Sequence, residues 1–454
     1  MLFEADQQTY IDLDLFPQGK GSSSIFSLFD HTITSGGNSR LEYFFKNPFS
    51  EYELLNDRKN SILFFQHNNI SFVPDKVKTD FVEHYLLQGD YPTVFSGFRA
   101  YEKAIFNFFK ESNAHYIISR GIRYLNDLLN DLYLFFVETG KLECPSLISK
   151  YRQTIESSFR LPEFSIIKSL QKRKRLYPHE IERLDLIFRY TMKEKIRELL
   201  TIYYDVDVFI SVASVAEKRG FSLPEYVKQS ESFIELTGLT HPFPENPVGN
   251  DLFFNPGSNM LFLSGPNMAG KSTLLKSIGV AVFLAHIGFP VPALKMRTSI
   301  YDGLLTGINI PDSITKGHSH FYSEVKRVKV VAEGISRNMK LVVLFDELFR
   351  STNIRDSYDG SLSIIKALEK VNHSVFLFSS HITELAEPLH ENENIQFKSI
   401  SFSNDTLKSK DNYRLTNGVN NESNGMSIIE SEGILDLIGQ TIKNKEENQT
   451  FKKS

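Results

Sequence analysis

Apolar positions in the first half of the chain recur with a helical period. Between about residues 25 and 235 they alternate at spacings of three and four, as in "DLLNDLYLFFVETG", which is typical of packed amphipathic helices. The stretch "IERLDLIFRYTMKEKIRELLTIYYDVDVFISVASVAEKRG" is too long for an ordinary globular helix, so we expect one long helix or two in tandem. Gly220, after Lys218 and Arg219, is a typical helix stop signal.

The pattern changes after about residue 236. A Pro-, Gly- and Asn-rich connector, "THPFPENPVGND", precedes the strand-length apolar runs "MLFLSG", "LVVLFDE" and "SVFLFSSH". Helix-compatible stretches separate these runs, which predicts a parallel sheet covered by helices. We therefore expect a helical domain at 1–235, an α/β domain with a mostly parallel sheet at 236–440, and a disordered polar tail at 441–454.

Composition predicts a soluble globular protein of more than one domain. The 454 residues are 41% hydrophobic and 23% charged, and the net charge of −4 argues against a uniform coating of an anionic partner. Cys144 is the only cysteine, which excludes an internal disulfide or a cysteine-based zinc site and predicts a cytoplasmic location. We expect no signal peptide and no membrane span, because no apolar run reaches ~18 residues.

A phosphate-binding pattern, G-x-x-x-x-G-K-[ST], occupies residues 265–272. Its glycines let the backbone curl so that N–H groups point at phosphate oxygens, and the helix that follows adds the positive end of its dipole. Lys271 would reach the β- and γ-phosphates, and the Ser272 hydroxyl would coordinate Mg²⁺. The alternative is a chance glycine turn, against which the preceding strand and following helix argue.

Two acids end the run "LVVLFDE" downstream of this loop. Asp346 would hold Mg²⁺, and Glu347 would orient or deprotonate an attacking water. A strand ending in solvated acids is the alternative, and the loop upstream makes it the weaker one. His381 ends "SVFLFSSH", where ligands bind in open α/β sheets, and could contact the γ-phosphate, although lone histidines are usually structural.

A loop with one glycine leads into a helical stretch at 314–327, "ITKGHSHFYSEVKR". Ser319 either caps this helix or donates a hydrogen bond to a phosphate. His318 and His320, two residues apart and without further ligands, form a poor metal site.

Together these segments resemble the MutS family. The family's phosphate-loop segment is similar to "SGPNMAGKSTLLKSIGVAVFLAHIGFPVPA", its Ser-x-Phe-x-x-Glu signature to "HSHFYSEV", its acidic strand end to "DELFRSTNIRDSYDGSLSI" and its histidine segment to "SSHITEL". The family's Gly-rich tail resembles "YRLTNGVNNESNGMSIIESEGI", and its helical core resembles "DQQTYIDLDLF", "FSLFDHTITSGGNSRLEYFFKNPF", "RKNSILFF" and "YYDVDVFISVASVAEKRGFSLPEY". The resemblance covers nearly the whole chain.

The resemblance implies an ABC-type P-loop ATPase domain preceded by an all-α lever domain like the MutS core. It implies that Glu347 is the general base, that His381 is a sensor, that Lys271 also acts in catalysis, and that Ser272 and Asp346 bind magnesium. It further implies that Ser319 completes the site of a neighbouring subunit, in a homodimer or a MutS-like heterodimer. The implied ATP-binding residues are Gly265, Pro266, Asn267, Met268, Ala269, Gly270, Lys271, Ser272, Thr273 and Ser319.

Three residues depart from the family pattern in the ATPase domain. Ala269 replaces a glycine, and its methyl group fits if its φ is negative. Phe349 and Ser351 also stand where glycines are typical, in a loop expected to cross the dimer interface. We therefore expect the chemistry to be retained and the communication between sites to be altered.

The helical half departs from the family more strongly. The core-like segment begins at Asp6, so we expect no mismatch-reading or connector domain, and 161–207 is too short for the usual clamp. The tail is also too short for the family's helix-turn-helix dimerisation element. The basic cluster Lys172, Arg173, Lys174 and Arg175 could grip DNA phosphates without reading sequence, or it could be a solvated helix end.

The sequence therefore predicts a MutS-like, Mg²⁺-dependent ATPase that closes as a dimer on DNA during repair or recombination. Without the mismatch wedge, we expect shaped DNA such as a branch, or recognition by a partner. The alternative is an ATP-driven mechanical module that acts on a protein or ribonucleoprotein without binding DNA. A small-molecule kinase is disfavoured because it leaves the helical half and the signature segment unexplained.

Overall fold

The chain forms two compact units in a computed structural model that describes residues 2–19, 21–68, 70, 72–87, 113–164, 177–228, 231–266, 269–310, 320–400, 412–420, 433–435 and 437–438. The sheet unit consists of Met1–Asp14, Pro224–Leu284 and Val291–Ser454. The helical unit consists of Leu15–Leu223 and Ala285–Pro290. The predicted boundary at 236 differs from this division, because residues 1–14 and 224–235 group with the sheet unit.

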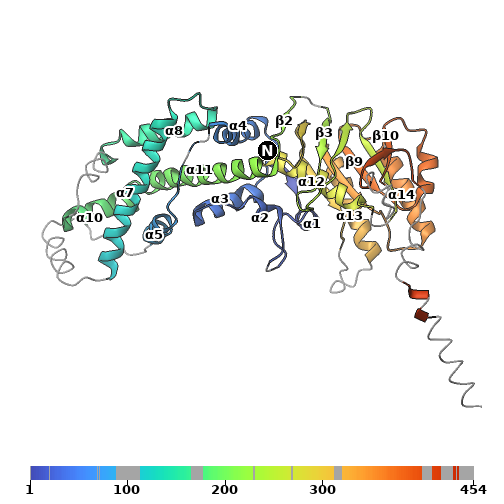
Figure 1. Cartoon of the computed structure of the whole chain (residues 1–454), viewed down its shortest axis with the longest axis horizontal. Coiled ribbons are helices and arrows are strands. Elements are labelled where there is room, and N and C mark those ends of the chain that lie inside the picture. Colours follow the sequence, from blue (N-terminus) through green and yellow to red (C-terminus); the bar gives the residue numbers. More distant parts are fainter. Residues whose placement is uncertain are drawn as a thin grey trace, which may run out of the picture. The chain divides into compact units, whose positions relative to one another are not determined.

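The helical unit is built around α11 (Lys193–Arg219), against which α3 and α4 pack (Figure 1). Its other described elements are α2 (Ile25–Phe29), α3 (Ser35–Lys46), α4 (Tyr52–Asn68), α5 (Lys76–Leu86), α7 (Asn113–Thr139), α8 (Ser146–Phe159), α10 (Pro178–Leu186) and the π-helical turn η1 (Ile187–Thr191). The two helices α10 and α11 and the turn between them are the tandem arrangement that the sequence predicts. Gly220 ends α11 with a φ of 65°, as its position indicates.

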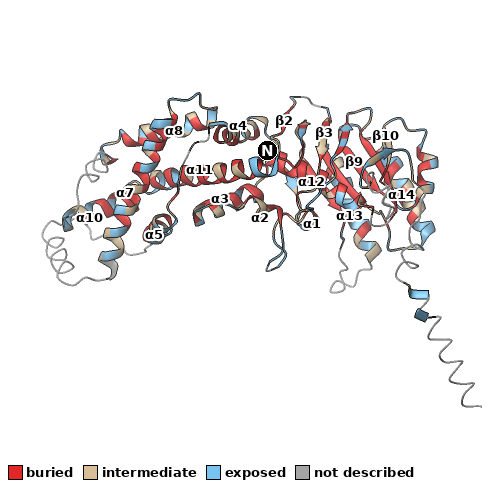
Figure 2. Ribbon diagram, in the orientation of Figure 1, coloured by how far each residue is buried: buried red, intermediate tan, exposed pale blue. Residues whose placement is uncertain are grey.

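Burial makes α11 the core helix of this unit, and most of its ribbon is buried in Figure 2. Length and composition alone would let it cross a membrane, contrary to our expectation from uninterrupted apolar runs, but 83% of its most apolar window is buried inside the protein. Its buried Asp207 accepts hydrogen bonds from the backbone N–H groups of Ile33 (3.0 Å) and Thr34 (2.9 Å) and from the Thr34 hydroxyl (2.7 Å). That hydroxyl in turn caps α3 by accepting from Gly37 N–H.

The sheet unit contains a seven-stranded sheet in the order β1-β7-β8-β9-β5-β10-β11 among the described residues. All neighbouring strands are parallel except β10 and β11, so the predicted, mostly parallel sheet is confirmed. The strands are β1 (Glu4–Ala5), β5 (Met260–Ser264), β7 (Gly303–Gly307), β8 (Leu341–Asp346), β9 (Val375–Ser379), β10 (Ile395–Ile400) and β11 (Leu415–Asn417).

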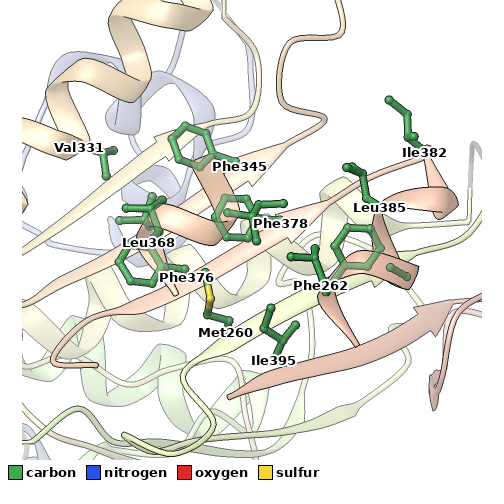
Figure 3. Packing of buried hydrophobic residues seen from close by; sticks show 14 of the residues in the cluster. Met260, Phe262, Val331, Phe345, Leu368, Phe376, Phe378, Ile382, Leu385 and Ile395 are labelled. Atoms are coloured by element: carbon green, nitrogen blue, oxygen red, sulfur yellow. The ribbon is translucent and has the colours of Figure 1, made fainter. Parts of the chain in front are cut away.

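Helices cover both faces of this sheet, and its central strands β5, β8 and β9 are therefore apolar up to their last residue. On one face Phe262, Phe345 and Phe378 pack with residues from α13, α14 and the 3₁₀-helix η3 (Figure 3). On the other face Leu344 lies against Gly279 of α12. The helices of this unit are α1 (Gln7–Asp12), α12 (Lys271–His286), α13 (His320–Ser336), α14 (Ile354–Leu368) and η3 (Thr383–Leu389).

A second, four-stranded sheet in the order β2-β6-β3-β4 was not foreseen from the sequence. Its strands are β2 (Glu225–Tyr226), β3 (Ile234–Leu239), β4 (Asn250–Phe254) and β6 (Lys295–Thr298). The connector "THPFPENPVGND" links β3 to β4, whose pairing is antiparallel. It therefore joins two strands of one sheet rather than two domains.

Asp207→Ala should destabilise the helical unit, because three donors lose a buried acceptor. We expect a loss of about 3 kcal/mol, measured as a lower urea midpoint by circular dichroism at 222 nm. Asp127→Ala is the matched control, since its carboxylate is 48% exposed and lies 3.4 Å from Lys78 Nζ, and exposed pairs contribute little. Equal midpoints for the two variants would contradict this role of Asp207.

Candidate functional site

Three neighbouring parallel strands end at the same edge of the sheet. Ser379 of β9 is paired on one side with Asp346 of β8 and on the other with Leu263 of β5. The segments that follow these strands therefore meet at one edge, where ligands bind in open α/β sheets. The three motifs predicted from the sequence are the ones brought together here.

The phosphate-loop pattern follows β5 and leads into α12. Gly265 and Gly270 have φ values of 143° and 98°, and a Cβ at Gly265 would collide with the Ile400 carbonyl. The Lys271 ammonium is buried and donates to the carbonyls of Gly265 (2.7 Å) and Pro266 (3.2 Å). Burial lowers the pKa of Lys271, against the opposite effect of the nearby carboxylates of Glu347 and Asp346. A phosphate would give this desolvated charge a stronger partner than two carbonyls do.

Asp346 lies between two hydroxyl groups. Ser272 at the start of α12 and Ser379 at the end of β9 both donate hydrogen bonds to its carboxylate. Hydroxyl and carboxylate oxygens suit Mg²⁺, which keeps several waters and binds through few protein ligands together with phosphates. Within the described part of the chain, no group of three or more His, Cys, Asp or Glu side chains could hold a metal. The oxygens of Ser272 and Asp346 fit a magnesium ion that arrives with a nucleotide.

Glu347 directly follows β8 in a left-handed conformation, with a φ of 56°. Its backbone N–H donates to the Ser379 carbonyl (3.1 Å), and its Oε1 lies 3.5 Å from Nδ1 of His381. The interaction with His381 is the main cause that lowers the pKa of Glu347, and Lys271 and Arg350 act in the same direction. Glu347 in turn raises the pKa of His381. The left-handed backbone conformation of Glu347 is uncommon for residues other than glycine, and such conformations recur at functional sites.

The structure describes most of the predicted nucleotide-site residues, and their roles remain predictions. Ala269 does not take a positive φ, so its methyl group fits as expected. The predicted nucleotide-site residues that the structure describes at this edge are Gly265, Pro266, Ala269, Gly270, Lys271, Ser272, Thr273, Asp346, Glu347 and His381. Those that lie outside the described residues are Asn267, Met268, Ser319, Lys172, Arg173, Lys174 and Arg175.

A pocket of about 400 Å³ adjoins the phosphate loop and was missed by sequence reasoning. Its lining includes Gly270, Thr273, His241, Asn250 and Tyr413. Asn250 holds the segment from Tyr413 to Leu415 in place. Its Nδ2 donates to the Tyr413 carbonyl (3.0 Å), and its Oδ1 accepts from the Leu415 backbone N–H (2.8 Å). The Tyr413 ring lies against Gly270: a Cβ atom on Gly270 would be only 3.1 Å from a carbon of the ring.

No local pattern could have found this pocket, because Asn250 and Tyr413 are 163 residues apart in the sequence. The available signal was chemical: a histidine and amides in "THPFPENPVGND", and an aromatic residue in "YRLTNG". Burial lowers the pKa of His241, and nearby Lys276 lowers it further, which favours the neutral imidazole. Aromatic rings and amides beside a phosphate loop suit a nucleotide base.

Comparisons with known proteins point to one family. The family model described as MutS domain V matches residues 261–448. A DNA mismatch repair protein MutS of Petrotoga mobilis is 29% identical over 67% of this chain and 38% of its own length. Proteins of the same name from Thermotoga maritima and Clostridioides difficile are each 27% identical, over 70% and 63% of this chain and over 41% and 32% of their own lengths.

The chain thus spans at most about two fifths of the length of these curated relatives. The matched segment 261–448 includes β5 from its second residue onward, the phosphate loop, Asp346, Glu347 and His381, which are the parts of the site described above. The order of these motifs and their convergence at one sheet edge agree with the family match. The domain V match and the similarity to MutS proteins together support a MutS family member.

Proposed function

We propose that this chain binds and hydrolyses ATP in a P-loop ATPase domain of ABC type and couples hydrolysis to a change of state on DNA. The main support is the contact of Ser272 with Asp346, beside Lys271 and next to the Glu347–His381 pair. One sheet edge thereby offers a phosphate partner, oxygen ligands for a metal and an ionised carboxylate. The printed names of the relatives, DNA mismatch repair protein MutS, support the DNA part of the proposal.

Phosphate binding is the first step of this mechanism. Lys271 exchanges the Gly265 and Pro266 carbonyls for the β- and γ-phosphate oxygens. Ser272 and Asp346 would hold Mg²⁺, which would supply positive charge next to the phosphates. The base lies in the pocket beside Gly270, against Tyr413 and His241. Gly270 of the phosphate loop lines that pocket, as does Thr273 directly after the loop, so base and phosphates have adjacent sites.

Hydrolysis then requires a water aligned with the γ-phosphate. Glu347 accepts a hydrogen bond from this water and takes its proton as the water oxygen bonds to phosphorus. The bond from phosphorus to the bridging oxygen breaks, ADP leaves with the electron pair, and the proton passes from Glu347 to solvent. His381 keeps the Glu347 carboxylate ionised, since the pair lowers the pKa of the acid.

A helix that starts at the nucleotide site provides a route for coupling. The first residues of α12 carry the phosphate-loop lysine and serine, whereas Ala285–Pro290 belong to the helical unit. There the Ile287 carbonyl accepts from Arg58 (2.8 Å), and the Phe289 ring lies 5.5 Å from that of Phe29. A shift of α12 on nucleotide binding would therefore act on the helical unit. We propose that a dimer with composite sites, in which Ser319 contacts the partner's nucleotide, uses this route.

Glu347→Ala should bind ATP with near-normal affinity but turn it over about 10²–10⁴-fold more slowly, because the water loses its base. Lys271→Ala should instead lose tight binding. Phosphate release and equilibrium binding of labelled ATP separate the two effects. Glu391→Ala, at an exposed carboxylate, is the control. Turnover by Glu347→Ala at the wild-type rate would contradict the proposed base.

The pKa of His381 should lie above its ordinary value of about 6.5 in protein free of nucleotide and magnesium, because Glu347 favours the imidazolium. This pairing adds stability below that ordinary pKa and loses it as the pH rises through the raised pKa. NMR titration of the ring proton, assigned with His381→Ala, measures the value. In the Glu347→Gln variant the pKa of His381 should fall toward its ordinary value. Identical titrations in both proteins would show that the pair does not interact.

Replacing Lys172, Arg173, Lys174 and Arg175 by alanine should weaken binding to duplex and four-way DNA, and the salt dependence should become less steep by ~0.9 per lost phosphate contact. The matched control exchanges Lys and Arg at these four positions and keeps their charge. Fluorescence anisotropy across a salt series gives the slopes. Unchanged affinity and slope would favour the alternative, a mechanical module acting on a protein or ribonucleoprotein.

The same assay tests the expectation that the chain selects DNA by its shape. Clear preference of the wild type for mismatched duplex would refute that expectation.

A further inference from the structure

The loop between β8 and α14 has a second residue in the left-handed region. Besides Glu347, Phe349 has a φ of 57°, and a bulky residue rarely adopts this conformation unless its surroundings impose it. The Phe349 side chain is only 6% exposed, so it is packed inside its own chain. The contacts of this loop therefore decide where Glu347 lies.

On one side the loop is held by α14. The Ser357 and Ser361 hydroxyls both donate to the Leu348 carbonyl, at 3.3 and 3.2 Å. Gly360 leaves room for the Phe349 ring, since a Cβ there would lie 3.0 Å from a ring carbon. These contacts keep the loop against the helix that follows it in the sequence.

On the other side the loop is held by α13, through two contacts. The Phe349 ring lies 5.6 Å from the Phe321 ring in an edge-on arrangement. The Ser351 hydroxyl donates to Oε2 of Glu324 at 2.7 Å, and Glu324 is only 4% exposed. A hydrogen bond to a buried carboxylate is among the stronger kinds. Both loop residues stand where the MutS family, by the resemblance described above, typically has glycines, and glycines could make neither contact.

We propose that α13 sets the position of Glu347, with Phe349 and Ser351 as positioning residues that join its loop to Phe321 and Glu324. This inference rests on the proposed function, because it concerns the same acid. Because α13 starts at His320, directly after Ser319, a displacement of this end of α13 would act on the Glu347 loop through these two contacts. ATP turnover then depends on α13, whereas ATP binding does not.

A double-mutant cycle between Ser351 and Glu324 tests this inference. Ser351→Ala should lower kcat at saturating ATP about tenfold, the size expected for a hydrogen bond to a charged group, and leave the Kd for ATP within about twofold. Ser351→Thr, which keeps the hydroxyl, should restore kcat. In a Glu324→Ala background, Ser351→Ala should have little further effect. Glu324→Leu, which removes the acceptor but fills a similar volume, replaces Glu324→Ala in the cycle if that variant does not fold.

Ser363→Ala is the matched control, because that hydroxyl donates to the Asp359 carbonyl within α14 and should leave kcat unchanged. If Ser351→Ala and Glu324→Ala lower kcat by independent factors, or if Ser351→Ala changes Kd and kcat equally, the inference is overturned. Loss of turnover in Glu347→Ala together with normal turnover in Ser351→Ala overturns the inference alone. A wild-type chain without ATP turnover overturns the proposed function as well.

Discussion

The register of β5, β9 and β8 is the constraint on which the site depends. It places Ser379 beside Asp346 and brings the end of β5 to the same edge. A slip of two residues would move one strand by about 7 Å along its neighbour and separate Ser272 from Asp346. Because these strands are buried on both faces, their register is set by packing such as that of Phe262, Phe345 and Phe378 (Figure 3). The aromatic core therefore determines the geometry of the polar edge.

Sequence reasoning succeeded wherever a structural cause was local. The strand-length apolar runs, the glycines of the phosphate loop and the stop at Gly220 depend on residues near in sequence, and the structure has each in place. Because parallel strands align their carboxyl ends, the meeting of Asp346 and Ser272 could also be predicted.

What the sequence could not reveal depends on contacts between distant segments. Strand β1 has two residues, too few for a period, yet Glu4 and Ala5 pair with β7 and join the N-terminus to the main sheet. The Asn250–Tyr413 hydrogen bond and the Ser379–Asp346 contact likewise arise from topology. The packing of Phe349 against Phe321 was missed for the same reason, although the substitution itself was visible.

The packing energy of Phe349 explains how a non-glycine residue can hold a left-handed conformation in this loop. A left-handed conformation costs a non-glycine residue roughly 1–2 kcal/mol. Burying a phenylalanine side chain contributes ~1.5–3 kcal/mol, and an edge-on aromatic pair adds ~0.5–1.5 kcal/mol. Packing therefore exceeds the strain. A glycine would adopt the same φ without strain, but it would leave the space beside Gly360 empty and the loop free to sample other conformations. The buried aromatic ring thus restricts the loop backbone to one conformation. Glu347, two residues earlier in the same loop, is held in place with it.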